Sequence, residues 1–255
     1  MTPDQAYAEL VRLSREETLL SSCAGILQWD AEICMPRGGV AHRSGQMGLL
    51  AALVHDPATD PRIDELLRAV ESSSLTEDPD SVQAVNVREI RRDFDRVTRL
   101  PRKLVEEMAR VSALSSQAWS EARDKDDFPS FAPWLEQTFA LAREKADAIG
   151  YTDGRYDALL DDYEPGITTA RLTPLFANLR AQLVPLVDTL RERASSSGAG
   201  TLDRELPIEG QRAFAEGVAT ELGFDLECGR FDLGPHPFCT FIGPGDVRIA
   251  LRYHA

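Results

Sequence analysis

Apolar residues recur at helical spacing through long stretches of this chain. The clearest stripe predicts a helix near 172–190 and consists of Leu172, Leu175, Phe176, Leu179, Leu183, Leu186, Val187 and Leu190. Intervals of three, four and seven residues place such side chains on one face of an α-helix. Thr168 or Thr169 could cap the start of this helix, and Pro185, which has no N–H, should kink it. The stripe therefore predicts a long amphipathic helix whose apolar face packs against another part of the structure.

The same periodicity predicts further helices along most of the chain. Their expected ranges are 3–27, 40–54, 61–73, 80–98, from 104 onward, 135–149 and 208–222. Turn-forming residues collect between them at 55–61, 77–80 and 195–200, of which the last predicts a surface loop. We therefore predict a mostly α fold, an assembly of long helices in which residues 1–255 form a single helical unit.

One stretch near the end departs from the helical pattern. Residues 238–242 and 247–253 are rich in β-branched and aromatic side chains, and the run Gly243-Pro-Gly-Asp246 separates them. Two such runs around a short Gly-rich loop are typical of a β-hairpin, which we place at 238–253. Because two strands alone are marginally stable in water, the hairpin must pack on helices or on another strand.

Composition limits the classes of partner. The formal net charge of −14 argues against nucleic acid and against an anionic membrane surface, since both require clustered basic residues. No stretch reaches the roughly 18 consecutive apolar residues of a membrane span, and the start lacks the features of a signal peptide. The four cysteines show no paired spacing, as expected for thiols in a reducing compartment. We expect a cytoplasmic protein.

Three separated blocks carry a more specific signal. They are Leu27-Gln-Trp-Asp-Ala-Glu-Ile-Cys-Met-Pro36 with Arg43 and Gln46, the run from Tyr156 to Thr169, and the run from Gly223 to Tyr253 with its His-Pro-Phe and Asp-x-Arg motifs. In content and order these blocks resemble the N-terminal half of the Taq-type thermostable metallocarboxypeptidases. The resemblance covers essentially the whole chain.

The resemblance implies a zinc-dependent activity in complete members of the family, which are typically homodimers that remove single residues from peptide C-termini. Their zinc site contains His-Glu-x-x-His, whose two imidazoles lie one helical turn apart. The histidines here are His42, His55, His236 and His254, and no two of them have that spacing. We therefore expect no metal site and no catalytic residue in this chain, and no activity from it alone.

Two residues are candidates for substrate contact by resemblance. His236 stands in the His-Pro-Phe motif, which lies at the substrate cleft in the family, and Arg248 could offer a planar fork to a peptide carboxylate. The structural alternatives are a rigid turn between Pro235 and Pro237, and an Arg248 that pairs with acids on a strand. Ala250 stands where the family motif has threonine, which weakens the functional interpretation.

The remaining motif residues are interpreted as structural: Trp29, Asp30, Pro237, Phe238 and Asp246. We expect Trp29 and Asp30 to form a corner in which the indole fills the core and the carboxylate caps or pairs. The acidic run at 161–164 lacks the ligand spacing of a calcium loop and is interpreted as a helix end.

Two functions remain open at this point. The chain could be a peptidase subunit completed by a separate zinc-bearing half, or a non-catalytic module that binds peptides or regulates a complete carboxypeptidase. The expected partners are a second copy of the chain or the missing half, together with peptides. We also expect self-association that covers the 172–190 stripe, the hairpin, or both, because large exposed apolar patches are rare on monomers.

Overall fold

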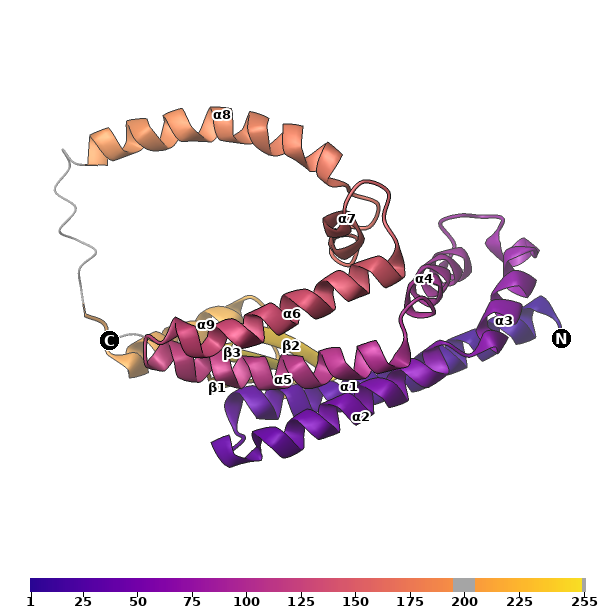
Figure 1. Ribbon diagram of the computed structural model, residues 1–255, viewed down its shortest axis with the longest axis horizontal. Helices are drawn as coiled ribbons and strands as arrows, with labels where there is room; N and C mark the ends of the chain where they lie inside the picture. The colour runs from indigo at the N-terminus through magenta and orange to yellow at the C-terminus, as the bar shows by residue number, and fades with distance from the viewer. Residues whose placement is uncertain (195–204, 254–255) are drawn as a thin grey trace. The chain divides into compact units, whose positions relative to one another are not determined.

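The computed structural model describes residues 1–194 and 205–253 (Figure 1). Its internal contacts divide the chain into two compact units, Met1–Ile149 with Leu226–Arg252, and Gly150–Asp225 with Tyr253–Ala255. The loop predicted at 195–200 lies outside the described residues. Whether 1–255 behaves as one helical unit stays a prediction.

The prediction of a mostly α fold with a small β element is confirmed. The first unit contains α1 (Pro3–Ile33), α2 (Val40–Ala58), α3 (Pro61–Glu71), α4 (Val82–Val97), α5 (Arg102–Asp124), α6 (Phe128–Ile149), β1 (Gly229–Leu233), β2 (Phe238–Gly243) and β3 (Asp246–Leu251). The second contains α7 (Arg155–Leu160), α8 (Thr169–Ala194) and α9 (Ile208–Glu221). None of these described helices combines the length and apolar character needed to cross a membrane.

Several helix ends differ from the sequence-based ranges, among them the start of α6, which begins at Phe128 and not near residue 135. α1 begins with a capping box between Thr2 and Gln5 and continues past residue 27 to Ile33. It ends shortly before Pro36, a residue that disfavours helix in the position preceding it. α2 runs through Pro57, so most of the loop expected at 55–61 is in fact helix. A proline this close to the C-terminus of a helix removes only one backbone hydrogen bond.

Long helices in the first unit pack side by side. α2 contacts both α1 and α5, and α5 in turn contacts α6 (Figure 1). At Gly48 a Cβ atom would lie 3.3 Å from the carbonyl oxygen of Glu106, so glycine allows α2 and α5 to approach closely. A buried apolar cluster joins α1, α3 and α4, and its members are Ala6, Leu10, Ile63, Leu66, Leu67, Val70 and Val87.

The predicted hairpin is present as the antiparallel pair β2–β3, with a tight turn at Gly245, whose φ is +80°. The sequence prediction missed β1, which pairs in parallel with β3 and makes the strand order β1-β3-β2. β2 contacts α1, and a Cβ at Gly25 would lie 3.4 Å from Ile242 Cδ1. The hairpin is thus supported by both a helix and another strand.

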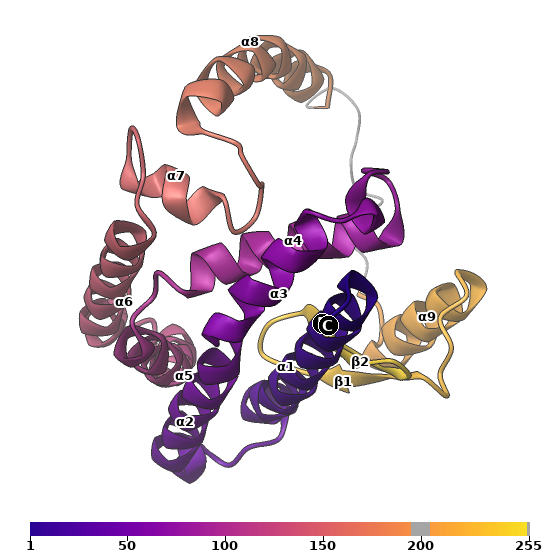
Figure 2. The ribbon, with the colours of Figure 1, turned by 90° about the vertical axis from the view of Figure 1, so that its right-hand side faces the viewer.

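The second unit contains the long amphipathic helix. α8 continues through Pro174 and Pro185 as a curved ribbon (Figure 2). At its start the N–H of Thr169 donates to Asp157 Oδ1 over 2.8 Å, so an acceptor outside the helix takes the role expected of a threonine side chain. The apolar stripe is about half exposed, as the fractions of Leu175 (54%), Leu183 (45%) and Leu190 (55%) show.

Candidate functional site

The site is built where the end of α1 meets the three-stranded sheet. Trp29, in the last turns of α1, is 3% exposed, and its ring lies 5.2 Å from that of Phe238 on β2, centroid to centroid, at 56°. This tilted geometry is among those that aromatic pairs favour. The expectation that the indole fills core is thus consistent with its position.

Arg248 on β3 lies against the same indole. Its Cζ atom is 5.9 Å from the Trp29 ring centroid, within the range of a cation–π contact. Nε and Nη2 donate to Asp246 Oδ1 and Oδ2 over 2.9 and 2.8 Å. These hydrogen bonds lower the pKa of Asp246 and raise the pKa of Arg248. The Nε–Nη2 edge of the guanidinium is therefore held by a carboxylate of the same strand, which agrees with the structural alternative for Arg248. Substrate contact by Arg248 stays a prediction.

The neighbouring strand repeats this charge pattern. Arg230 is in register with Arg248, and its Nη2 atom donates to Asp232 Oδ1 over 2.5 Å. The other oxygen of Asp232 is buried and has no hydrogen-bond partner. Since side chains two residues apart lie on one face of a strand, the two Arg–Asp pairs share one face of the sheet. That face presents fixed, alternating charge.

Asp30 fixes the corner between α1 and α2. Its Oδ2 atom accepts from Arg43 Nη2 over 2.6 Å, while Arg43 Nη1 donates to the carbonyl oxygen of Leu27 over 2.5 Å and Nε donates to Gln46 Oε1 over 3.1 Å. Arg43 is nearly buried, with 13% of its side chain exposed. In this block of the sequence, Arg43 thus hydrogen-bonds both Asp30 and Gln46.

His236 lies in a different environment. The turn between β1 and β2 leaves His236 exposed, with its ring edge-on to Trp119 of α5 at 6.4 Å between centroids. The carbonyl oxygen of Pro235 accepts from Nη1 atoms of Arg123 and Arg252, each over 3.3 Å. This turn is therefore tied through its backbone to α5 and to Arg252, the residue that follows β3, which agrees with a rigid turn.

A small cavity of about 60 Å³ lies beside this turn. Its lining comes from α1, the residues just after it, α5 and the turn: Gln28, Ala31, Glu32, Met35, Ala113, Ser116, Gln117, Trp119, Ser120 and Pro235. Glu32 accepts from Gln28 Nε2 and Ser116 Oγ, each over 2.9 Å. The sequence analysis did not single out Glu32, Ser116 and Trp119. In the linear sequence they look like ordinary helix residues, and only the contact of α1 with α5 brings them together.

The structure brings together four of the motif residues: Trp29, Phe238, Asp246 and Arg248. His236 contacts α5 instead, and the cavity beside it is lined by neither His236 nor Arg248. A shared concavity for His236 and Arg248 stays a prediction. Pro237 follows His236 and precedes β2, where its fixed φ suits the turn.

Metal-ligating side chains do not converge in residues 1–194 and 205–253, where no group of three His, Cys, Asp or Glu side chains could hold an ion. His42 and His55 both lie on α2, but His55 is buried and its Nε2 lies 2.9 Å from the carbonyl oxygen of Leu100. His254 lies outside the described residues. The donor set of residues 1–194 and 205–253 does not fit zinc.

Comparison with known proteins identifies the family. The family model described as Carboxypeptidase Taq (M32) metallopeptidase matches residues 9–255, and the chain belongs to this family. Thermostable carboxypeptidase 1 of Thermus thermophilus is 42% identical over 100% of this chain, and that of Pyrococcus furiosus is 34% identical over 98%. The solved structure of Trypanosoma cruzi metallocarboxypeptidase 1 superposes with a TM-score of 0.79 at 32% identity, covering 98% of this chain.

The chain matches only about half the length of these relatives. The chain spans 52% of the Thermus protein, 50% of the Pyrococcus protein and 50% of the Trypanosoma chain. The resemblance to half of a metallocarboxypeptidase is therefore confirmed at the level of family and coverage.

Proposed function

We propose that residues 1–255 form a metal-free half of an M32 carboxypeptidase, which positions a peptide while a further polypeptide segment supplies zinc and the general base. The observation that carries this proposal is the family match over residues 9–255 to proteins twice as long, together with a described donor set that offers no zinc site. Zinc held by that further segment would supply a Lewis acid, and a carboxylate there would supply the base for water. By this proposal the chain is inactive alone.

The role assigned to this half is substrate positioning. Arg248 already uses its Nε–Nη2 edge for Asp246, so a peptide carboxylate would bind at Nη1 or displace Asp246. Trp29 beneath the guanidinium restricts its rotation, which reduces the entropy lost on binding. His236 would contact the peptide from the turn beside α5.

The experiment compares two preparations. Purified chain, checked for helix content by circular dichroism, is assayed for release of C-terminal amino acids with and without added zinc or cobalt. The same chain is then co-expressed with the part of the Thermus relative that it does not match. We expect no release from the chain alone and chelator-sensitive release from the pair. Stoichiometric zinc and chelator-sensitive release in the chain alone would overturn the proposal.

A second candidate is a non-catalytic partner that binds peptides or a complete carboxypeptidase. The exposed apolar stripe of α8 favours it, since such a face is typical of an interaction surface. A stable complex with a complete relative, but no release on co-expression with the missing half, would favour this function. By this proposal the partners include a second copy of the chain. A cytoplasmic location, where thiols stay reduced, would suit its four free cysteines.

A further inference from the structure

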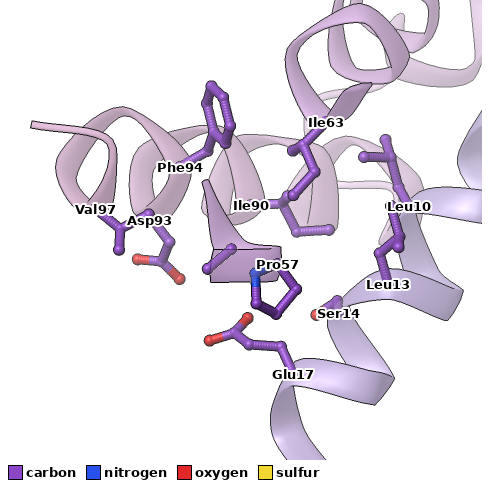
Figure 3. A pocket seen from close by; sticks show the side chains of 11 residues that line it. Leu10, Leu13, Ser14, Glu17, Pro57, Ile63, Ile90, Asp93, Phe94 and Val97 are labelled. Atoms are coloured by element: carbon purple, nitrogen blue, oxygen red, sulfur yellow. The ribbon is translucent and has the colours of Figure 1, made fainter. Parts of the chain in front are cut away.

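A pocket of about 160 Å³ opens in the first unit (Figure 3). On α1 it is lined by residues between Leu10 and Glu17, in the half of the helix away from Trp29 and Asp30. α1, α3 and α4 supply its apolar walls, and the end of α2 adds Pro57 and Ala58. The wall residues are Leu10, Leu13, Ile63, Ile90, Phe94 and Val97. A cavity of about 150 Å³ with such a lining can hold a benzene ring. The space therefore suits one small apolar body.

Glu17 is the unusual member of this lining. It is partly buried, and in the described part of the chain its carboxylate makes neither a hydrogen bond nor an ion pair. Burial raises the pKa of Glu17, and the nearby carboxylate of Asp93 raises it further. A partly desolvated charge without a partner is costly, so a cation at this position would be favourable.

Asp93 stands at the mouth of the same pocket. Figure 3 shows the carboxylates of Glu17 and Asp93 on the same side of the pocket, opposite Leu10 and Leu13. Asp93 exposes 75% of its side chain, and its ion pair with Arg92 is long, at 3.8 Å. The mouth thus carries two acidic groups beside an apolar interior.

We propose that this pocket binds a compact organic cation, an ammonium group attached to a small aromatic or branched aliphatic body. The ammonium would donate to Glu17 with Asp93 nearby, and the body would fill the space between Leu13, Ile90 and Phe94. A divalent metal ion fits poorly, since it requires several oxygen ligands and the remaining walls are apolar. An anion would be repelled, and a neutral ligand could donate a hydrogen bond to Glu17 but would leave its negative charge without a counter-charge.

The test titrates the full chain with benzylammonium chloride at pH 7, followed by amide chemical shifts and calorimetry, with benzyl alcohol as the neutral probe of equal shape. We expect saturable shifts at residues of the pocket and a dissociation constant about tenfold lower for the ammonium than for the alcohol, as a charge-assisted hydrogen bond predicts. Equal affinity for the two probes, or shifts spread over the acidic surface without saturation, would overturn the proposal.

Two variants separate the site from general acidity. Glu17→Gln should abolish the preference for the ammonium, whereas Glu16→Gln, an equal charge change on an exposed neighbour paired with Arg12, should preserve it. Ile90→Trp should block both probes by filling the pocket. Circular dichroism checks the fold of each variant. If Glu17→Gln folds and keeps the full preference for the ammonium over the alcohol, the proposal is wrong. If Glu17→Gln does not fold, the Ile90→Trp variant decides: loss of probe binding in the folded variant supports the site, and unchanged binding refutes it.

Discussion

Arg43 and Asp30 join two helices through an ion pair of 2.6 Å in which the arginine side chain is only 13% exposed. Because Arg43 also donates to Leu27 and Gln46, its removal eliminates several contacts at once. We expect Arg43→Ala to lower the free energy of unfolding by about 1.5–3 kcal/mol, the range for hydrogen bonds to charged groups. Urea denaturation followed by circular dichroism measures this change.

The matched control is Arg37→Ala. Arg37 pairs with Asp124 over 3.6 Å, and both side chains are largely exposed, at 73% and 63%. Exposed ion pairs contribute at most about 1 kcal/mol, so this variant should be nearly as stable as the parent chain. Equal losses in the two variants would show that the nearly buried contacts of Arg43 contribute no more than an exposed ion pair.

Asp246 makes stability depend on pH in a predictable direction. Its pKa is lowered in the folded chain by the hydrogen bonds from Arg248, so the pair contributes above the ordinary carboxyl pKa and is lost as pH falls through the lowered value. Asp246→Asn should therefore be less stable than the parent at pH 7, and the difference should shrink steadily below about pH 4. Thermal melts at a series of pH values measure it. A difference that stays constant down to pH 2 would contradict the assignment.

Gly234 is required by close approach. A Cβ atom there would lie 2.8 Å from Ile33 Cδ1 of α1. We expect Gly234→Ala to destabilise the fold by about 1–3 kcal/mol, the usual cost of overpacking. Adding Ile33→Val removes the clashing atom, so the double variant should be more stable than the sum of the single effects predicts.

Gly243→Ala serves as the comparison, because a Cβ at that position meets no atom within 4 Å. Its effect on unfolding should be clearly smaller than that of Gly234→Ala. If both variants lose the same stability, loss of backbone freedom rather than the contact with Ile33 is the cause.

The stripe on α8 should mediate self-association. Leu183 and Leu190 are exposed to 45% and 55%, and a charge on this face would oppose its burial against another apolar surface. We expect Leu183→Glu to lower the apparent mass at micromolar concentration in sedimentation velocity. Gln182→Glu adds the same charge at an exposed polar position of the helix and should leave the mass unchanged. A parent chain that is strictly monomeric would refute the prediction.

Most of the helical fold could be predicted from sequence, because helical periodicity is a local property. The stripe at 172–190 and the Gly-rich turn before Asp246 each identified their element correctly. β1 was missed although Arg230–Leu233 alternate charged and apolar side chains, as strands do, because the segment has only five residues and no turn signal of its own. Its existence depends on pairing with β3, which is a non-local contact.

The site was less predictable than the fold. The family resemblance selected Trp29, Asp246 and Arg248, but only the structure shows that the guanidinium of Arg248 donates two hydrogen bonds to Asp246. Spacing along the chain also could not indicate that Trp119 meets His236. The pocket at Glu17 left no motif, because it arises where side chains of separate helices fail to fill a space.

The order of strands has a consequence for synthesis of the protein. β3 lies between β1 and β2, which do not pair with each other. As the chain leaves the ribosome, β1 and β2 emerge first and have no strand to bond with until residues 246–251 follow. The helices from Pro3 to Ile149 can assemble earlier from their own contacts. The Arg248 contact with Trp29 thus cannot form until β3 has emerged, so a nascent chain halted before residue 246 would carry the helices from Pro3 to Ile149 without the site.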